Sequence, residues 1–256
     1  MSNMTNRPAR QNTNEVDPRG LDSDGRMLSG QALIDRVREL KGDTILLSFS
    51  CGKDSLALWL YLREHFEIIP FHLWWIPNME YVEVSLDYYE DYFQTHIYRM
   101  ASPVFYDMFT TCAFQPPDRV AVIDGLNMPR FDLPAVDNVL AGYLGLDEPF
   151  CAAGMRMADN LLRRTLMQQQ GVLGFKKRRY FYGIWDWNIE QVSEIINRHN
   201  VKLAPEYAVI GRTISSFQYQ ELADMRAAFP ADFEKLRQWF PLIDLEFFRY
   251  EQVGQA

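Results

Sequence analysis

Short apolar runs alternate with amphipathic stretches along most of the chain. Residues 43–49 (DTILLSF) and 68–75 (IIPFHLWW) are almost continuously apolar, which is typical of strands buried on both faces of a parallel sheet. Elsewhere apolar residues recur at helical spacing. The pattern predicts strands at 43–49, 68–75, 97–100, 150–153 and 179–184, and helices at 29–42, 56–62, 80–96, 135–144, 157–170 and 188–200.

The order of these elements predicts the fold class. Strands that alternate with helices form parallel sheets covered by helices, and such sheets twist. We therefore predict an α/β fold with a twisted parallel sheet and helices on both faces. Between residues 102 and 149 the pattern is less regular, and the helix at 135–144 is its clearest element. Pro230 and Pro241 separate further helices, which predict a helical C-terminal extension over residues 213–256 packed on the α/β domain.

The first 26 residues differ from the rest in composition. They contain no aromatic residue and carry four acidic and four basic side chains. Such a segment buries too little apolar surface to order itself. We therefore predict a flexible N-terminal tail over residues 1–26, followed by the α/β domain over residues 27–212.

Charge and cysteine content exclude several classes of protein. Because 34 acidic side chains outnumber 26 basic ones, the net charge is −8, which disfavours a broad nucleic-acid footprint. The longest apolar run, 68–77, is shorter than the roughly 20 residues of a membrane span, and the N-terminus lacks the features of a secretory signal. Cys51, Cys112 and Cys151 are too far apart for a metal or redox pair. We expect a cytoplasmic protein without structural zinc, and a homo-oligomer remains open.

The segment Ser48–Ser55 (SFSCGKDS) places a turn of small residues between a predicted buried strand and a predicted helix. Such a turn exposes backbone N–H groups at a helix N-terminus, where anions bind. The hydroxyls of Ser50 and Ser55 can donate hydrogen bonds, Lys53 can neutralise charge, and Asp54 can hold a magnesium ion or fix the turn. The segment therefore predicts a phosphate site; the alternative is an ordinary capped turn.

SFSCGKDS resembles the SGGxDS loop of the PP-loop ATP pyrophosphatases and, among them, the loop of the phosphoadenosine phosphosulfate (PAPS) reductase-like family. Three later segments resemble elements of that family in the same order, so the resemblance covers about residues 27–249. It implies an adenine nucleotide alpha hydrolase-like fold. The later segments are Gly154-Met155-Arg156 with Asp159, Asn160 and Arg163, then Ile184-Trp185-Asp186-Trp187, then Pro205-Glu206-Tyr207 with Gly211 and Arg212.

The resemblance implies that the protein binds ATP with magnesium and cleaves between the α- and β-phosphates. The products would be AMP and pyrophosphate, as in a hydrolase, or an adenylylated acceptor, as in a transferase. It also implies that the end of the second strand reads adenine. The implied catalytic residues are Lys53, Asp54, Arg156 and Arg163, with Asp54 also the metal ligand; the nucleotide-binding residues are Ser48, Ser50, Cys51, Gly52, Lys53, Asp54, Ser55, Leu73, Trp74 and Gly154; and the candidate substrate-binding residues are Arg178, Arg179, Asp186 and Arg212.

The cysteine content departs from that family, because no cysteine follows Cys151. Thiol-dependent reduction of PAPS needs one thiolate to attack sulfur and a second thiol to resolve the product. We therefore expect no autonomous reductase activity. Two alternatives stay open: binding or reduction of PAPS with thiols supplied by a partner, and a non-catalytic nucleotide-sensing module. The second would work with a ParB-like protein, as some relatives in phage and mobile elements do.

Other features have both a functional and a structural interpretation. Cys51 is either a thiolate activated by the helix N-terminus or a small side chain tolerated in a tight turn. Cys151 favours core packing. The basic run 175–179 contacts either a second phosphate, a nucleic-acid backbone or only solvent. The four histidines lack metal-ligand spacing and predict no chemistry.

Overall fold

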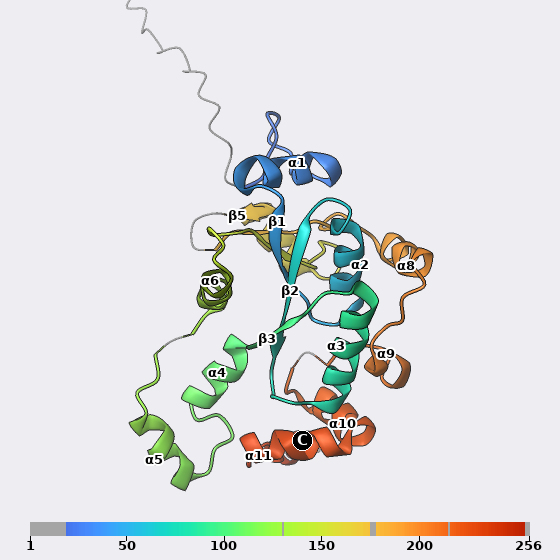
Figure 1. Cartoon of the computed structure of the whole chain (residues 1–256). Coiled ribbons are helices and arrows are strands. Elements are labelled where there is room, and N and C mark those ends of the chain that lie inside the picture. Colours follow the sequence, from blue (N-terminus) through green and yellow to red (C-terminus); the bar gives the residue numbers. More distant parts are fainter. Residues whose placement is uncertain (1–18, 130, 175–177, 215, 254–256) are drawn as a thin grey trace, which may run out of the picture.

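A computed structural model describes residues 19–129, 131–174, 178–214 and 216–253 (Figure 1). Its strands are β1 (Thr44–Ser48), β2 (Glu67–Trp74), β3 (Tyr98–Ala101), β4 (Cys151–Ala153), β5 (Leu173–Gly174) and β6 (Tyr180–Phe181). In the described ranges they form one six-stranded sheet in the order β3-β2-β1-β4-β6-β5. All neighbours are parallel except β5 and β6, so the predicted parallel α/β sheet is confirmed apart from that edge.

Helices cover both faces of this sheet (Figure 1). The helices are α1 (Gly30–Lys41), α2 (Lys53–Leu62), α3 (Glu80–Phe93), α4 (Pro103–Thr110), α5 (Pro117–Gly125), α6 (Leu133–Leu144), α7 (Leu161–Gln170), α8 (Ile189–Arg198), α9 (Pro205–Val209), α10 (Tyr219–Ala228), α11 (Pro230–Trp239) and α12 (Leu245–Val253). Side chains of α2, α3 and α8 share one buried cluster with β1, whereas α6 packs on the opposite face. None of the helices in the described ranges is long and apolar enough to cross a membrane.

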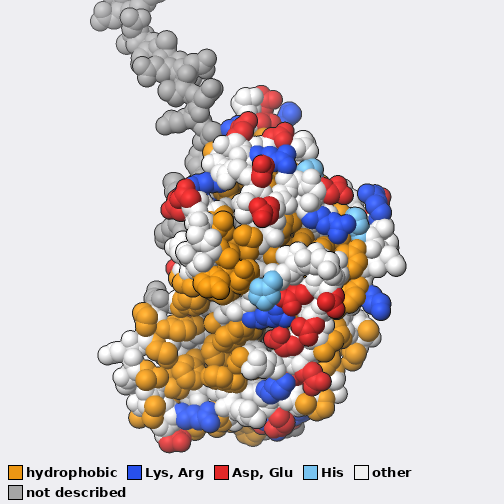
Figure 2. All heavy atoms as spheres, in the orientation of Figure 1, with side chains coloured by type: hydrophobic (Ala, Val, Ile, Leu, Met, Phe, Trp, Pro, Cys, Tyr) orange, Lys and Arg blue, Asp and Glu red, His pale blue; other side chains and the backbone are white. Residues whose placement is uncertain are grey.

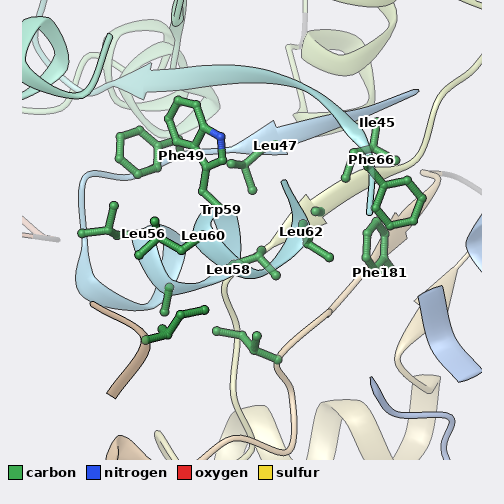
Figure 3. Packing of buried hydrophobic residues seen from close by; sticks show 14 of the residues in the cluster. Ile45, Leu47, Phe49, Leu56, Leu58, Trp59, Leu60, Leu62, Phe66 and Phe181 are labelled. Carbon is green, nitrogen blue, oxygen red and sulfur yellow. The ribbon is translucent and has the colours of Figure 1, made fainter. Parts of the chain in front are cut away.

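Strand β1 shows why its sequence is continuously apolar. Successive side chains of a strand point to opposite faces. Leu47 packs on the α2 side, and Leu46 packs on the α6 side with Phe71. Figure 3 shows Leu47 and Phe49 lying over α2, where the Phe49 and Trp59 rings meet edge to face with centroids 5.0 Å apart. Burial on both faces holds β1, and therefore the turn that follows it, in one position.

The order of the strands locates a crevice. From β1 the chain moves outward through β2 to β3 and then returns to β4 on the other side of β1. This topology is consistent with a Rossmann-like fold, in which ligands bind outside the carboxyl ends of the strands where the order reverses. That point lies here between β1 and β4, directly after residues 48 and 153.

Three predicted elements differ from the structure. The helix predicted from residue 157 begins at Leu161, because the Asn160 side chain caps it by accepting the Arg163 N–H at 2.8 Å. The strand predicted at 179–184 is limited to β6, and a turn follows it. The irregular segment 102–149 also contains α4 and α5. A proline begins each of them, because the first helical position needs no N–H donor.

The last part of the chain packs on the carboxyl end of the sheet as α10, α11 and α12. It forms a second buried cluster with α4 and the β2–α3 connection, including Ile76, Phe105 and Phe240. Asp232 of α11 accepts the backbone N–H groups of Glu80 at 2.7 Å and Tyr81 at 3.1 Å, so it caps α3. This extension therefore helps to hold the element that walls the crevice.

The segment predicted as a flexible tail is ordered over its described part. Residues 1–18 of this segment lie outside the described residues. Residue Leu21 forms an antiparallel bridge with Met27, and the carbonyl oxygen of Arg19 accepts the Val172 N–H at 2.9 Å. Backbone hydrogen bonds therefore connect the described part of this segment to the rest of the chain, and the flexible tail stays a prediction.

Hydrophobic side chains gather on one face of the molecule. Figure 2 shows them over the side where Figure 1 places α4, α5 and α6. Exposed hydrophobic residues of these helices, and of the position directly after α5, are Val104, Val122, Leu126, Leu133, Val139 and Tyr143. Contiguous exposed apolar surface is typical of contacts with other molecules.

Candidate functional site

A cavity of about 640 Å³ opens at the carboxyl ends of the strands. Its wall includes the turn after β1, the end of β2, the first turn of α3, Gly154 after β4, and α9 with the residues that follow it. The cavity thus occupies the crevice where the strand order reverses. Of the expected site residues, it is lined by Ser50, Cys51, Gly52, Lys53, Asp54, Ser55, Leu73, Trp74, Gly154, Arg163 and Arg212.

Two serines fix the turn between β1 and α2. Ser55 Oγ accepts the Ser50 N–H at 3.2 Å, lies 3.0 Å from Ser50 Oγ, and donates to the Gly52 carbonyl at 2.9 Å. The one hydrogen of the Ser55 hydroxyl is therefore donated inside the turn, and its predicted role in nucleotide binding stays a prediction. Ser55 shapes the turn, whereas Ser50 is exposed at its surface.

The N-terminus of α2 points its backbone at the cavity. Gly52 occupies the N-cap position, and no side chain caps the helix there. The first N–H groups of a helix have no partner inside the helix, and its dipole favours negative charge. Of the first-turn residues, Lys53 and Asp54 both line the cavity. The turn therefore has the chemistry of an anion site.

Gly154 allows β4 to approach this helix closely. A Cβ atom added to Gly154 would lie 2.7 Å from Ser55 N and 2.9 Å from the Asp54 carbonyl carbon. These are backbone atoms of the first turn of α2, so they cannot move aside as a flexible side chain would. Only glycine therefore fits at position 154. Its close contact with the first turn of α2 brings Arg156, two residues later, near Asp54.

A network of alternating charges continues from the turn. Asp54 Oδ2 lies 3.2 Å from Lys53 Nζ, and Asp54 Oδ1 lies 2.8 Å from Arg156 Nε. Arg156 Nη2 is 2.6 Å from Asp159 Oδ1, and Arg163 also pairs with Asp159. Three cations thus meet two carboxylates, which leaves one positive charge in excess beside the cavity.

The members of this network play different geometric parts. The Arg156 side chain is 6% exposed and does not line the cavity, whereas that of Arg163 is 39% exposed and does. Arg156 therefore holds Asp54 from behind and is a positioning residue. Arg163 can reach a ligand directly.

Tyr207 and Thr213 bring two hydroxyl groups to the turn. The Lys53 N–H donates to Tyr207 Oη at 3.1 Å, and Thr213 Oγ1 lies 2.9 Å from the same oxygen. The Lys53 N–H can only donate, so it uses no hydroxyl hydrogen. The Tyr207 and Thr213 hydroxyls together carry two hydrogens, and the hydrogen bond between them uses one. Whichever hydroxyl donates to the other, one hydrogen remains for a third group. Both residues line the cavity, so that hydrogen is available to an anion there.

His72 is a neutral acceptor in the cavity wall. Its Nδ1 lies 2.9 Å from the Phe49 carbonyl oxygen, which can only accept, so Nδ1 carries the proton. Burial lowers the pKa of His72 to about 4, so its ring is uncharged at pH 7. Nε2 is therefore without a proton. Beside it, the Trp74 carbonyl accepts the Ser102 N–H at 3.0 Å, so the sheet uses this oxygen at the expected adenine position.

Glu206 is a buried carboxyl group in the same wall. It is 3% exposed, and its Oε2 has no hydrogen-bond partner among the described residues. Burial raises the pKa of Glu206. The Cys51 thiol, which is 3% exposed, has its pKa raised well above its usual value by burial and by the charge of Glu206. Burial therefore favours the neutral thiol of Cys51, and its φ of 60° shows that it occupies a position where glycine is favoured.

Five expected site residues lie away from the cavity wall. Ser48 ends β1, Arg156 lies behind Asp54, and Asp186 is exposed after β6. Arg178 and Arg179 immediately precede β6, so they lie at the amino end of a strand parallel to β4, opposite the cavity. There Arg178 pairs with Asp137, Arg179 pairs with Glu148, and both arginines line a separate cavity of about 30 Å³. Residues 175–177 of the basic run lie outside the described residues.

Arg212 lines the main cavity, but acidic side chains of α10 already neutralise it. Its Nη1 is 3.1 Å from Glu221 Oε1, and its Nη2 is 2.5 Å from Asp224 Oδ2. The segment that carries Arg212 also supplies Glu206, Tyr207 and Thr213. The resemblance to the PAPS reductase-like family pointed to this segment, but within it only Arg212 was predicted as a site residue.

Within the described ranges, no group of three or more His, Cys, Asp or Glu side chains could hold a metal ion. A magnesium ion needs fewer protein ligands, because it commonly uses one or two carboxylates together with substrate phosphates and water. Asp54, Glu83 and Glu206 are carboxylates of the cavity wall. The donor set therefore fits a magnesium ion that arrives with a phosphate ligand, and does not fit a metal held by the protein alone.

Comparison with known proteins leaves the chain without an assigned family. No protein-family model matches it. A search of the curated proteins also found no match.

Proposed function

We propose that the cavity binds ATP with its phosphates on the turn at residues 49–55, as in an adenine nucleotide alpha hydrolase-like protein. The protein then cleaves between the α- and β-phosphates and releases pyrophosphate. AMP is either released by hydrolysis or transferred to an acceptor. The observation that carries this proposal is the N-terminus of α2, which lines the cavity beside a side-chain network with one excess positive charge.

The turn would stabilise the leaving pyrophosphate. Backbone N–H groups of the first turn of α2 and the Lys53 ammonium group face the site where negative charge would increase. Asp54 holds Lys53 Nζ at 3.2 Å, and Arg156 fixes Asp54, so the cation is in place before the ligand arrives. The free hydroxyl hydrogen of the Tyr207–Thr213 pair would donate to a phosphate oxygen.

Arg163 would act on the transferred phosphoryl group. Its guanidinium reaches the cavity from α7, and Asp159 orients it from behind. A planar guanidinium forms paired hydrogen bonds with phosphate oxygens. Magnesium, when bound with the nucleotide, would neutralise phosphate charge between these cations. His72 and the end of β2 would form the wall against the base.

The reaction products test the proposal. The protein is incubated with ATP and magnesium, and the nucleotides are separated by ion-exchange chromatography. AMP with an equal amount of pyrophosphate is expected, whereas ADP, or no turnover with any acceptor tried, would contradict it. Calorimetric titration with ATP and with PAPS shows which nucleotide the turn prefers, and tighter binding of PAPS would favour a sulfonucleotide ligand instead.

A variant pair ties the reaction to the turn. Lys53→Ala is expected to reduce AMP formation by about 100-fold or more, because it removes a preorganised charge from the leaving group. Its unfolding temperature should change little, because the side chain is 32% exposed. The matched control is Lys41→Ala, since Lys41 pairs with Asp147 outside the cavity wall. Equal loss of activity in both variants would contradict the proposed role.

A further inference from the structure

Glu206 is the carboxyl group in the cavity wall that lacks a cation. Its side chain is buried, at 3% exposure, and yet it lines the cavity. Oε2 accepts no hydrogen bond, and Glu206 forms no ion pair, among the described residues. A buried carboxylate without a counter-charge destabilises a fold, so such a group in a cavity is a candidate for binding a ligand.

Each of the other two carboxylates of the wall lies beside a protein cation, although Arg99, the partner of Glu83, also pairs with Asp87 and Glu90. Asp54 lies between Lys53 and Arg156, at 3.2 Å and 2.8 Å. Glu83 Oε2 lies 3.4 Å from Arg99 Nε. A cation that enters the cavity would have to compete with a protein cation at either position, but not at Glu206.

Glu206 is also placed next to the phosphate turn. Its neighbour Tyr207 accepts the Lys53 N–H at 3.1 Å, which holds α9 against the first turn of α2. A triphosphate on that turn and an ionised Glu206 would repel each other across the cavity. A positively charged group between them would remove both the repulsion and the missing partner of Glu206.

We propose that Glu206, and not Asp54, is the protein ligand of the magnesium ion that accompanies the nucleotide. This inference rests on the proposed function. A hard divalent cation prefers oxygen ligands, and magnesium commonly takes one carboxylate, the phosphates and water. Asp54 then serves to position Lys53 and Arg156. The sequence motif alone does not distinguish this positioning role from metal binding.

Calorimetry of ATP binding, with excess magnesium or with EDTA, tests the inference on the full chain. For the wild type, magnesium should tighten ATP binding by about tenfold or more. Glu206→Gln keeps the shape of the side chain and should lose that gain, while its metal-free affinity for ATP equals or exceeds that of the wild type. Glu83→Gln is the matched control and should keep the gain, because Glu83 lines the same cavity but pairs with Arg99.

Electron paramagnetic resonance of manganese provides a readout without turnover. With manganese and ATP, the wild type and Glu206→Gln should give different spectra of bound metal, because a charged carboxylate ligand is replaced by a neutral amide or by water. Glu206→Asp, which keeps the carboxylate but shortens it, should retain part of the magnesium gain. Unliganded Glu206→Gln should unfold at or above the wild-type temperature, since it lacks the unpaired carboxyl.

The outcomes separate this inference from the proposed function. If Glu206→Gln keeps the full magnesium gain, or if the wild type binds ATP equally well with EDTA, only the role of Glu206 is overturned. If Glu83→Gln loses the same gain as Glu206→Gln, the effect reflects the charge of the cavity and not coordination, which also overturns it. If the wild type binds no ATP under either condition, the proposed function fails together with the inference.

Discussion

Two buried arginine–aspartate pairs lie at opposite ends of the central strands and have different surroundings. Arg156 and Asp54 meet at the carboxyl ends, beside the cavity of about 640 Å³. Arg178 and Asp137 meet at the amino end, beside a cavity of about 30 Å³. The first pair belongs to a network with one excess positive charge, whereas the second is a balanced pair that also donates a hydrogen bond from Arg178 to Cys151 Sγ at 3.2 Å.

The comparison shows that burial of an ion pair does not by itself identify a site. Both arginines are largely buried, and each forms an ion pair with its aspartate. At the amino end, burial raises the pKa of Cys151 to about 12, as expected for a closed interior. What distinguishes the Arg156 pair is its place where the strand order reverses, an open cavity, and a charge that the protein leaves unbalanced.

Removal of Arg178 gives the largest expected effect on stability. Arg178→Ala leaves Asp137 buried without a cation and should lower the free energy of unfolding by about 3–5 kcal/mol. Urea denaturation followed by circular dichroism measures the change. Combining it with Asp137→Asn should restore part of the loss, because no buried charge then remains. A loss below about 1 kcal/mol would show that the pair is solvated, and ATP affinity of the folded protein should not change.

Buried His72, in the cavity wall, makes the free energy of unfolding depend on pH. Its pKa is lowered to about 4 in the folded protein from 6.5, so below pH 6.5 the unfolded chain binds the proton more readily. The folded state should therefore lose up to about 3 kcal/mol as the pH falls from 6.5 to 4. Urea unfolding across this range measures the slope. His72→Asn, which can still donate to Phe49, should reduce the slope, whereas the same change at exposed His96 should leave most of it.

Removal of Arg156 should affect the reaction more than the fold. In Arg156→Gln, Asp54 keeps Lys53 and Asp159 keeps Arg163, so unfolding should become easier by only about 1–2 kcal/mol. AMP formation should fall by about 100-fold, because Asp54 is no longer fixed. Urea denaturation and product chromatography measure the two effects. A stability loss as large as that of Arg178→Ala would remove the distinction between the two pairs.

The smallest expected effect comes from a single hydroxyl group. Tyr207→Phe removes the acceptor of the Lys53 N–H and the remaining hydroxyl hydrogen of the pair with Thr213. Binding of ATP, measured by calorimetry, should weaken by about threefold to tenfold, as for the loss of one hydrogen bond. Tyr92→Phe is the control, because Tyr92 donates to His199 outside the cavity wall and its loss should leave ATP affinity unchanged.

The sequence alone correctly predicted the elements whose structure depends only on a few neighbouring residues. The apolar run of β1, the amphipathic pattern of α8 and the turn SFSCGKDS each predict their own structure, because burial on both faces, a capping Asn188 and small residues act over a few positions. The turn residues 50–55 and Gly154 do line the cavity. The length of β6 was overestimated, since the apolar residues that follow Phe181 belong to a turn.

Sequence alone determined that this chain forms a largely parallel α/β sheet with a turn of small residues after its first strand, because both follow from periodicity and local backbone chemistry. Only the tertiary structure decided which distant side chains meet that turn. Arg178 and Arg163 are both arginines near strands, but strand direction sends the first to the closed end and α7 carries the second to the cavity. Glu206 shows the same limit, because a missing counter-charge is a property of everything that surrounds a residue, and no local pattern records it.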